Sequence, residues 1–383
     1  MQLFSPLENE ISQTLNLIST CIDKTFPLPT RFRRDLPKDI SELSQLLTNN
    51  RGARNETYLN KPAYLSAYIR YFLPWNVFRL CKLLPNLSLS FNYEDAVTDL
   101  GSGPLTFPLA LWISYPALRN IPLEFRCVDQ SSTALNAGKK LFFALAGEKS
   151  PWRIKTIRDD INTEIKGKKS AFIFAGNVFN EQFLNIPYKD KHTFSLFTEK
   201  TTRLLLRHSE NKADILIVEP GIPQCGAFIT SLRTLFLESN YTPHFPCTHK
   251  ESCPFPSGEK TKWCHFTFET EDAPNDLLKL SEKAKLPKER ASISFLFVSL
   301  KEKKNLKEET LSTRIISDSF PIQMQNRTGV YGRYACSGKG MLLISGTKTV
   351  IEKQKSGAVL FVKLKGNEKR DSKTNALMIE LQE

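Results

Sequence analysis

The sequence contains no long apolar stretch and no recognisable leader. None of its 383 residues falls in a run of the roughly 18 to 20 apolar residues that a membrane span requires. The first segment carries Glu8 and Glu10, whereas a mitochondrial presequence is rich in arginine and poor in acids. We therefore expect a cytoplasmic protein that is neither exported, imported nor held in a membrane, with its eight cysteines reduced.

Acidic residues are outnumbered by basic ones. Lysine and arginine total 53 against 40 aspartates and glutamates, which gives a net charge of +13. Residues 281–383 hold 20 of the basic residues and 11 of the acidic ones, so this quarter of the chain carries 20 − 11 = +9. An excess of this kind favours polyanionic partners, and nucleic acid is the first candidate.

The pattern of apolar residues divides the chain into four parts. Residues 1–87 have the three- and four-residue spacing of helices. Residues 88–242 contain short apolar runs separated by helix-length segments, at 96–100, 123–129, 171–175 and 214–218. Strands that are apolar on both faces are typical of a parallel sheet covered by helices on both sides. We expect a doubly wound, Rossmann-like α/β domain there.

The last two parts differ from this domain in composition. Residues 243–290 begin with a segment rich in cysteine, proline and histidine that has no apolar period, so packing alone cannot order it. Residues 291–383 contain runs at 292–298, 341–344 and 358–362 that are typical of antiparallel strands. We expect a small, basic, OB-like β domain there.

A nucleotide-type site is predicted after the first strand of the α/β domain. Gly101 and Gly103 follow Asp99 and precede a helix expected over 108–118, so the backbone can turn tightly beneath a ligand. Asp129 ends the next predicted strand and is placed to bind ribose hydroxyls. A third glycine is missing, because Leu105 follows Pro104 here, and the acidic end of the strand also suits a cofactor without phosphates, such as S-adenosylmethionine.

These residues resemble the first two motifs of class I S-adenosylmethionine-dependent methyltransferases. The resemblance implies that Asp159 or Asp160 flanks the adenine, and we include Asp160 and Asn177 among the expected cofactor-binding residues. Methyl transfer needs a positioned acceptor and often a base. Glu181 is the candidate base, although capping the next helix is its preferred role. The Asn/Asp-Pro-Pro-aromatic loop of amino-directed enzymes is absent, and no cysteine lies where it could attack a pyrimidine.

Four cysteines are candidates for a metal site. Cys247, Cys253 and Cys264 are separated by six and eleven positions, and Cys336 follows in a predicted tight turn. Four thiolates suit either zinc or an iron–sulfur cluster. His249 and His265 are alternative zinc ligands, and the spacing alone leaves iron–sulfur, zinc and no metal open.

The segments around these cysteines carry a more specific resemblance. Val218-Glu219-Pro220-Gly221, Pro246-Cys247-Thr248-His249, Cys253-Pro254 and Trp263-Cys264-His265-Phe266 are similar to a methyltransferase-like family of ribosomal small-subunit assembly factors, mitochondrial and bacterial. This resemblance implies a 4Fe–4S cluster on the four cysteines and binding to small-subunit rRNA, with catalysis uncertain.

Three functions therefore compete: an assembly factor bound to the small ribosomal subunit, an active rRNA methyltransferase, and a small-molecule methyltransferase with structural zinc. The added basic domain disfavours the third. We expect a monomer off the ribosome. The candidate RNA contacts are arginines in predicted turns and near the β domain, with solvated loop charge as an equal alternative; they are Arg31, Arg33, Arg34, Arg51, Arg54, Arg327 and Arg333.

Overall fold

The computed structural model describes the chain except for residues 1, 49–57, 166, 184–185, 187–189, 256–262, 302–309, 324–327, 367 and 382–383. None of the described helices is long and apolar enough to cross a bilayer.

The N-terminal region is helical, as the apolar spacing predicts. In α1 the side chains at 11, 15, 18 and 22 are buried on one face of the helix. The region comprises α1 (Asn9–Thr25), α2 (Thr30–Arg33), α3 (Leu36–Thr48), η2 (Tyr58–Asn60), α4 (Pro62–Ala67), η3 (Tyr68–Phe72), α5 (Leu73–Leu83) and η4 (Leu84–Asn86).

The centre of the molecule is an eight-stranded sheet in the order β3-β2-β1-β4-β5-β8-β6, with β7 also paired to β8. Strands β1 to β5 are parallel, and β8 runs antiparallel to β5, β6 and β7. The strands are β1 (Asp95–Leu100), β2 (Leu123–Asp129), β3 (Arg153–Arg158), β4 (Ser170–Gly176), β5 (Ser209–Pro220), β6 (Thr242–Phe245), β7 (Phe266–Glu269) and β8 (Arg290–Ser299). This is the expected Rossmann-like α/β fold.

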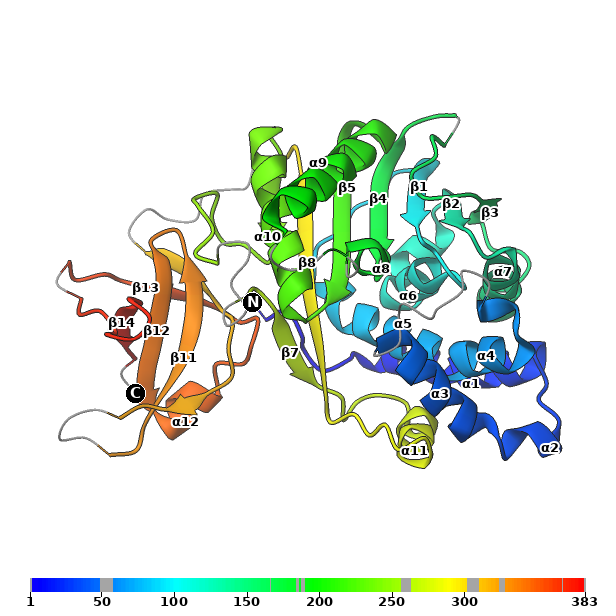
Figure 1. The fold of residues 1–383 in the computed structure, drawn as a ribbon, viewed down its shortest axis with the longest axis horizontal. Helices are drawn as coiled ribbons and strands as arrows, with labels where there is room; N and C mark the ends of the chain where they lie inside the picture. The colour runs from blue at the N-terminus through cyan, green and yellow to red at the C-terminus, as the bar shows by residue number, and fades with distance from the viewer. Residues whose placement is uncertain are drawn as a thin grey trace.

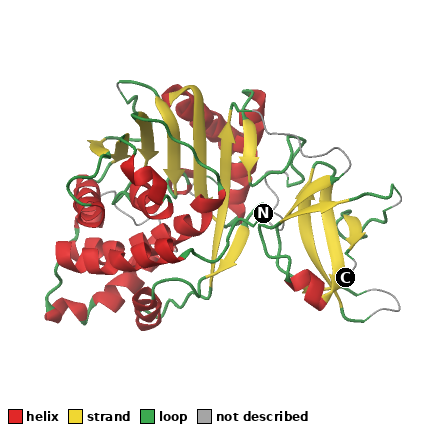
Figure 2. Cartoon of the chain, turned by 180° about the vertical axis from the view of Figure 1, so that it is seen from behind, coloured by secondary structure: helices red, strands yellow, loops and turns green. Residues whose placement is uncertain are grey.

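Helices cover both faces of this sheet (Figures 1 and 2). Alternate side chains of β4 enter opposite cores: Phe172 and Phe174 pack on the side of α6 and α7, and Ile173 packs on the side of α9 and α10. The α/β domain contains α6 (Thr106–Ser114), η5 (Pro116–Asn120), α7 (Ser132–Ala146), α8 (Asn180–Phe183), α9 (Lys191–His208), α10 (Pro223–Glu238) and, after β7, α11 (Asn275–Lys283).

The boundary expected at residue 291 is wrong. The run at 292–298 was expected to open the β domain, but it forms β8 in the middle of the large sheet, between β5 and β6. Its side chains from Ile293 to Ser299 are all buried, because one face packs on each core. The cysteine-rich segment is therefore an insertion between two strands of the large sheet.

The chain then forms a second sheet in the order β13-β9-β11-β12-β14, with β10 paired to β11. We keep the name β domain for residues 310–381. Neighbouring strands are antiparallel except β12 and β14, which are parallel. The elements are β9 (Leu311–Ile315), β10 (Phe320–Pro321), β11 (Val330–Ser337), β12 (Gly340–Thr347), α12 (Lys348–Glu352), β13 (Val359–Val362) and β14 (Leu377–Glu380).

The N-terminus lies between the two sheets (Figure 1). The ring of Phe4 stacks on Phe268 of β7 with 4.6 Å between ring centroids. A Cβ on Gly357 of the β domain would lie 3.0 Å from Leu3. The first residues of the chain thus pack against both lobes.

Candidate functional site

The turn after β1 is built around two glycines in the left-handed region. Gly101 has φ +67° and Gly103 has φ +52°. A Cβ on Gly101 would lie 2.3 Å from Cγ2 of Val178, whereas one on Gly103 would meet nothing within 4 Å. Gly101 is therefore required both by its backbone conformation and by close packing.

Asp129 closes this turn from the end of β2. Its Oδ2 accepts a 2.8 Å hydrogen bond from the amide of Gly103, and its Oδ1 accepts one of 2.8 Å from the amide of Ser131. The hydroxyl of Ser131 in turn caps α7 by accepting from Ala134 N at 3.1 Å. These bonds fix the carboxylate at the carboxyl edge of the sheet, where ligands of doubly wound folds bind.

Asp99 lies deeper, at 1 % exposure, and accepts a 2.5 Å hydrogen bond from Ser102 Oγ. Burial raises the pKa of Asp99 to about 8, although the bond from Ser102 opposes this shift. The carboxyl group therefore holds its proton at neutral pH and can donate a hydrogen bond.

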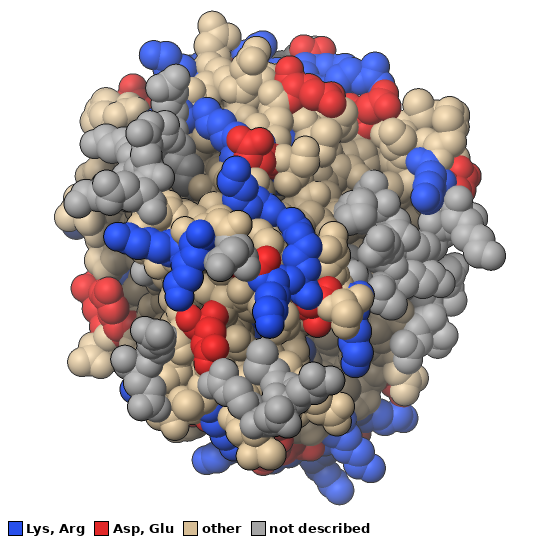
Figure 3. All heavy atoms as spheres, turned by 90° about the vertical axis from the view of Figure 1, so that its left-hand side faces the viewer, with Lys and Arg blue, Asp and Glu red and all other residues tan. Residues whose placement is uncertain are grey.

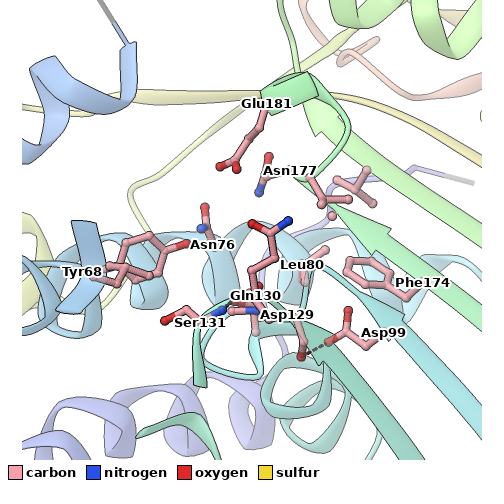
Figure 4. Close-up of a pocket in the computed structure, with 18 of the residues that line it drawn as sticks. Tyr68, Asn76, Leu80, Asp99, Asp129, Gln130, Ser131, Phe174, Asn177 and Glu181 are labelled. Atoms are coloured by element: carbon pink, nitrogen blue, oxygen red, sulfur yellow. Dashed lines mark hydrogen bonds between the residues drawn. The ribbon is translucent and has the colours of Figure 1, made fainter. Parts of the chain in front are cut away.

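A cavity of about 310 Å³ opens above these residues (Figure 4). It brings together Asp99, Gly101, Gly103, Asp129 and Asn177 from the residues expected to bind cofactor, and also Glu181. Asp160 is not among the lining residues; it holds the rim by accepting a 2.8 Å hydrogen bond from Gln130, which does line the cavity.

The N-terminal helices form one wall of this cavity, and their contribution was not predicted from the sequence. Among its residues are Tyr68, Asn76 and Arg79, whose guanidinium donates to Asn76 Oδ1. No carboxylate among the described residues forms an ion pair with Arg79. The polar residues at 76 and 79 of the mainly apolar α5 were the available signal, but the helical spacing of the neighbouring aromatic residues indicated a core position.

The loop after β4 forms the opposite wall. Asn177 has φ +55°, and its amide donates to Val218 O at 2.8 Å. Glu181 lies in the first turn of α8 with its side chain at the cavity (Figure 4). The completely buried Glu219 accepts hydrogen bonds from Phe179 N and from Asn180 Nδ2. This buried acid holds the loop in place.

A second cavity, of about 20 Å³, gathers all four candidate metal-binding cysteines. Cys247, Cys253 and Cys264 come from the insertion in the large sheet, and Cys336 comes from β11 of the β domain. Burial raises the pKa of Cys264 and Cys336, and charge on the neighbouring cysteines raises both further. Within the described part of the chain, no group of three or more His, Cys, Asp or Glu side chains is arranged to hold a metal ion.

Two buried arginines line the same cavity. Arg233 donates from Nε to Cys247 Sγ at 3.1 Å and from Nη2 to two carbonyls of the insertion, at 251 (2.7 Å) and 249 (3.0 Å). Arg314 of β9 donates to Pro246 O at 2.8 Å and to Gly357 O at 2.7 Å. His249 approaches Cys336 Sγ through Nε2 at 3.4 Å. The thiols therefore lie between cations that favour negative charge.

The expected RNA contacts have different positions. Arg31, Arg33 and Arg34 are exposed in and after α2, at the end of the molecule away from the β domain (Figure 1). Arg333 is only 6 % exposed and donates to Ile351 O and Ser317 O, so it stabilises the β domain and does not face a partner. Arg51, Arg54 and Arg327 lie outside the described residues.

The fold and cavity define a Rossmann-like α/β protein with a candidate ligand pocket at the carboxyl ends of its parallel strands. The family described as "Mitochondrial small ribosomal subunit Rsm22" matches residues 95–328, and the chain belongs to this family. The expected relationship to methyltransferase-like small-subunit proteins is confirmed. The family description names the mitochondrial subunit, so the cytoplasmic location stays a prediction.

Solved structures with similar folds share little sequence with this chain. A putative class I S-adenosylmethionine-dependent methyltransferase from Listeria monocytogenes is 10% identical, with 78% of this chain and 88% of that chain covered and a TM-score of 0.36. An S-adenosylmethionine-dependent methyltransferase from Geobacter sulfurreducens, solved with S-adenosyl-L-homocysteine, is 13% identical, with 59% and 90% covered and a TM-score of 0.33. NSun6 from Pyrococcus horikoshii, solved with SFG, is 9% identical, with 59% and 51% covered and a TM-score of 0.36. The comparison with curated proteins gave no match.

Proposed function

We propose that this protein binds S-adenosylmethionine and a 4Fe–4S cluster and acts on the small ribosomal subunit as an rRNA-binding assembly factor. The single observation that carries the proposal is the convergence of four cysteines from two lobes on one cavity, in a chain of this ribosomal family.

The residues around the larger cavity fit S-adenosylmethionine. The Asp129 carboxylate is fixed where ribose hydroxyls would donate to it, and the glycine turn lets a ligand approach the backbone closely. Arg79 offers a guanidinium without an ion-pair partner among the described residues, suited to the carboxylate of the donor's amino-acid end. When bound, the cofactor would supply an electrophilic methyl group.

The four thiols suit an iron–sulfur cluster, with zinc as the alternative, because four thiolates can hold either. The cluster is the choice that the resemblance of the cysteine segments implies. The buried cations Arg233 and Arg314 suit the negative charge of a thiolate-bound cluster.

The β domain supports RNA binding by its topology and its charge. Its order places a helix between the third and fourth long strands and pairs the third with the fifth in parallel, which agrees with an OB-like Greek-key arrangement. Lysine and arginine side chains spread over this end of the molecule (Figure 3). Exposed members include Lys353, Lys355, Lys363, Lys365 and Lys369.

Titration calorimetry tests the cofactor pocket. Asp129→Ala should weaken S-adenosylmethionine binding at least about tenfold, because hydrogen bonds to a charged group are worth about 1.5–3 kcal/mol. Asp160→Ala removes a rim carboxylate outside the lining and should have a smaller effect. Equal affinities in both variants and the natural protein would reject the assigned pocket.

Iron, sulfide and zinc analysis of anaerobically purified protein tests the cluster. We expect about four irons and four sulfides per chain, with visible absorbance lost in Cys336→Ser. Cys225→Ser is the matched control, since Cys225 is buried in α10 away from this cavity. Stoichiometric zinc without iron would refute the cluster.

Co-sedimentation with small subunits tests the partner. Lys363→Glu with Lys365→Glu should weaken association at low salt, whereas the same charge change at exposed Lys140 and Lys149 of the α/β domain should not. Salt should release the complex, because phosphate contacts displace counterions. If the protein co-sediments with neither mature nor immature small subunits, the proposed binding to the small ribosomal subunit is refuted.

An active rRNA methyltransferase is the second candidate, and the position of Glu181 favours it. This carboxylate lines the cofactor cavity, where a base could accept a proton from an acceptor. Comparing rRNA methylation in cells with the natural protein and with Glu181→Gln separates the two. Methylation lost in the variant supports an enzyme, and unchanged methylation supports an assembly factor.

A further inference from the structure

A third cavity lies at the edge of the large sheet opposite the cofactor pocket. Its volume is about 100 Å³, and it is bounded by the loop before β4 and by the last turn of α9, which precedes β5. The cofactor pocket is at the carboxyl ends of these same strands. In Figure 1 the loop before β4 extends beyond the end of the sheet away from α8.

The floor of this cavity is polar and buried. Thr98 and Ser170, each 1 % exposed, hydrogen-bond to each other at 2.7 Å. Arg126, at 9 % exposure, donates from Nε to Glu124 at 3.0 Å and from Nη1 to Lys168 O. An arginine in the middle of a strand is costly unless its donors are used, and its Nη2 has no bond among the described residues.

His208 gives the second observation. It is 5 % exposed and lines the cavity, and its Nε2 is buried without a hydrogen-bond partner among the described residues. Burial lowers the pKa of His208, the charges of Arg207 and Lys169 lower it further, and Glu164 and a backbone hydrogen bond at Thr163 oppose them. Arg207 and Lys169 line the same cavity as the imidazole.

The rim carries uncompensated positive charge. Lys168, Lys169 and Arg207 are exposed at the cavity mouth, and none of them has an ion pair among the described residues. Glu164 is the one acidic residue of the described lining. Arg126 is already paired with Glu124, so the three exposed cations against Glu164 leave a net charge of 3 − 1 = +2 around a space too small for a nucleoside.

We propose that this cavity binds a phosphate group, with Arg126 donating from the floor, beside the buried Nε2 of His208, and with Lys169 and Arg207 donating from the rim. A phosphate offers acceptor oxygens in several directions, which matches donors that converge from a strand, a loop and a helix end. The phosphate is either free orthophosphate or the terminal phosphate of a nucleic acid. This site is independent of the cofactor pocket, the cysteine cavity and the β domain.

Titration calorimetry of the full chain with orthophosphate tests the site, with S-adenosylmethionine affinity as the check on folding. Arg207→Ala should weaken phosphate binding about tenfold or more. Arg203→Ala is the matched control, since Arg203 is exposed one turn earlier on α9 and does not line the cavity. Lys169→Ala, in the loop, provides a second variant on another element and should act like Arg207→Ala.

A second arm compares 5′-phosphorylated and 5′-hydroxyl forms of one short oligoribonucleotide. Tighter binding of the phosphorylated form, lost in Arg207→Ala, identifies a nucleic-acid end as the source, whereas saturation by orthophosphate alone identifies the free ion. The proposal is overturned if neither phosphate form binds. It is also overturned if Arg203→Ala weakens binding as much as Arg207→Ala, because the effect is then general surface charge.

Discussion

The side-chain amide of Asn180 donates a 2.7 Å hydrogen bond to the carboxylate of Glu219, and so ties the start of α8 to the end of β5. Glu219 also accepts from the amide of Phe179 at 3.0 Å. Burial raises the pKa of Glu219 to about 8, although these hydrogen bonds oppose the shift. One buried acid thus controls the loop that carries Asn177 and Glu181.

Glu219 should make stability fall as pH rises. Its folded-state pKa of about 8 exceeds the ordinary 4.5, so between these values the native state binds more protons than the unfolded state. The free energy of unfolding then falls by up to about 1.4 kcal/mol per pH unit for this group. Urea unfolding of Glu219→Gln from pH 5 to 8 should show a smaller fall than the natural protein. Asp99 contributes a similar fall, so some dependence should persist. The same slope in both proteins would contradict this assignment.

The two glycines after β1 should respond differently to alanine. Gly101→Ala brings a Cβ to 2.3 Å from Val178 and adds strain at φ +67°, so we expect about 2–5 kcal/mol of destabilisation. Gly103→Ala adds only the backbone strain, about 1–2 kcal/mol. Denaturant unfolding measures both. Adding Val178→Ala should recover part of the loss in Gly101→Ala, and no recovery would mean that packing against Val178 is not the cause.

Arg333 should matter for stability and not for RNA affinity. Arg333→Gln removes hydrogen bonds of 3.0 Å to Ile351 O and 2.8 Å to Ser317 O, which should cost about 3 kcal/mol. Lys339→Gln, an exposed change in the same hairpin, should cost no more than about 0.5 kcal/mol. Thermal unfolding together with filter binding to rRNA checks both. Arg333→Gln that stays stable but loses RNA binding would reverse this assignment.

The Lys82–Asp272 pair should stabilise the N-terminal region against the segment after β7. Its atoms are 2.6 Å apart with the lysine side chain 6% exposed, and the same carboxylate accepts from Leu7 N at 3.0 Å. Asp272→Ala leaves a buried cation and should cost about 3–5 kcal/mol. Lys82→Met with Asp272→Ala should recover part of that loss in a double-mutant cycle. Purely additive effects would show that the pair is not coupled.

The sequence was most informative where the pattern of apolar residues in a segment also determines how that segment packs in the fold. The run at 171–175 is apolar on both faces, and such a strand has to be covered on both sides, so its place in a parallel sheet was predictable. The Asp99 and Asp129 positions followed from strand ends. The strand partners of residues 292–298 were not predictable. The first half of this run alternates polar and apolar residues, which fits either sheet, and the pairing is decided by contacts far along the chain. The role of Arg333 as an RNA contact was likewise wrong and that of Arg79 was not predicted, because the burial of an arginine depends on partners that its neighbours in sequence do not determine.

Cys336 lies on β11, 72 positions after Cys264. This separation fixes the order in which the four cysteines emerge during translation. The first three thiols leave the ribosome as part of an insertion in a sheet whose strand β8 has still to be translated. The fourth thiol becomes available only after β11 of the β domain has been translated. The four-thiol cavity is therefore among the last parts of the molecule to be completed, and a chain truncated before residue 336 would present three cysteines with no fourth.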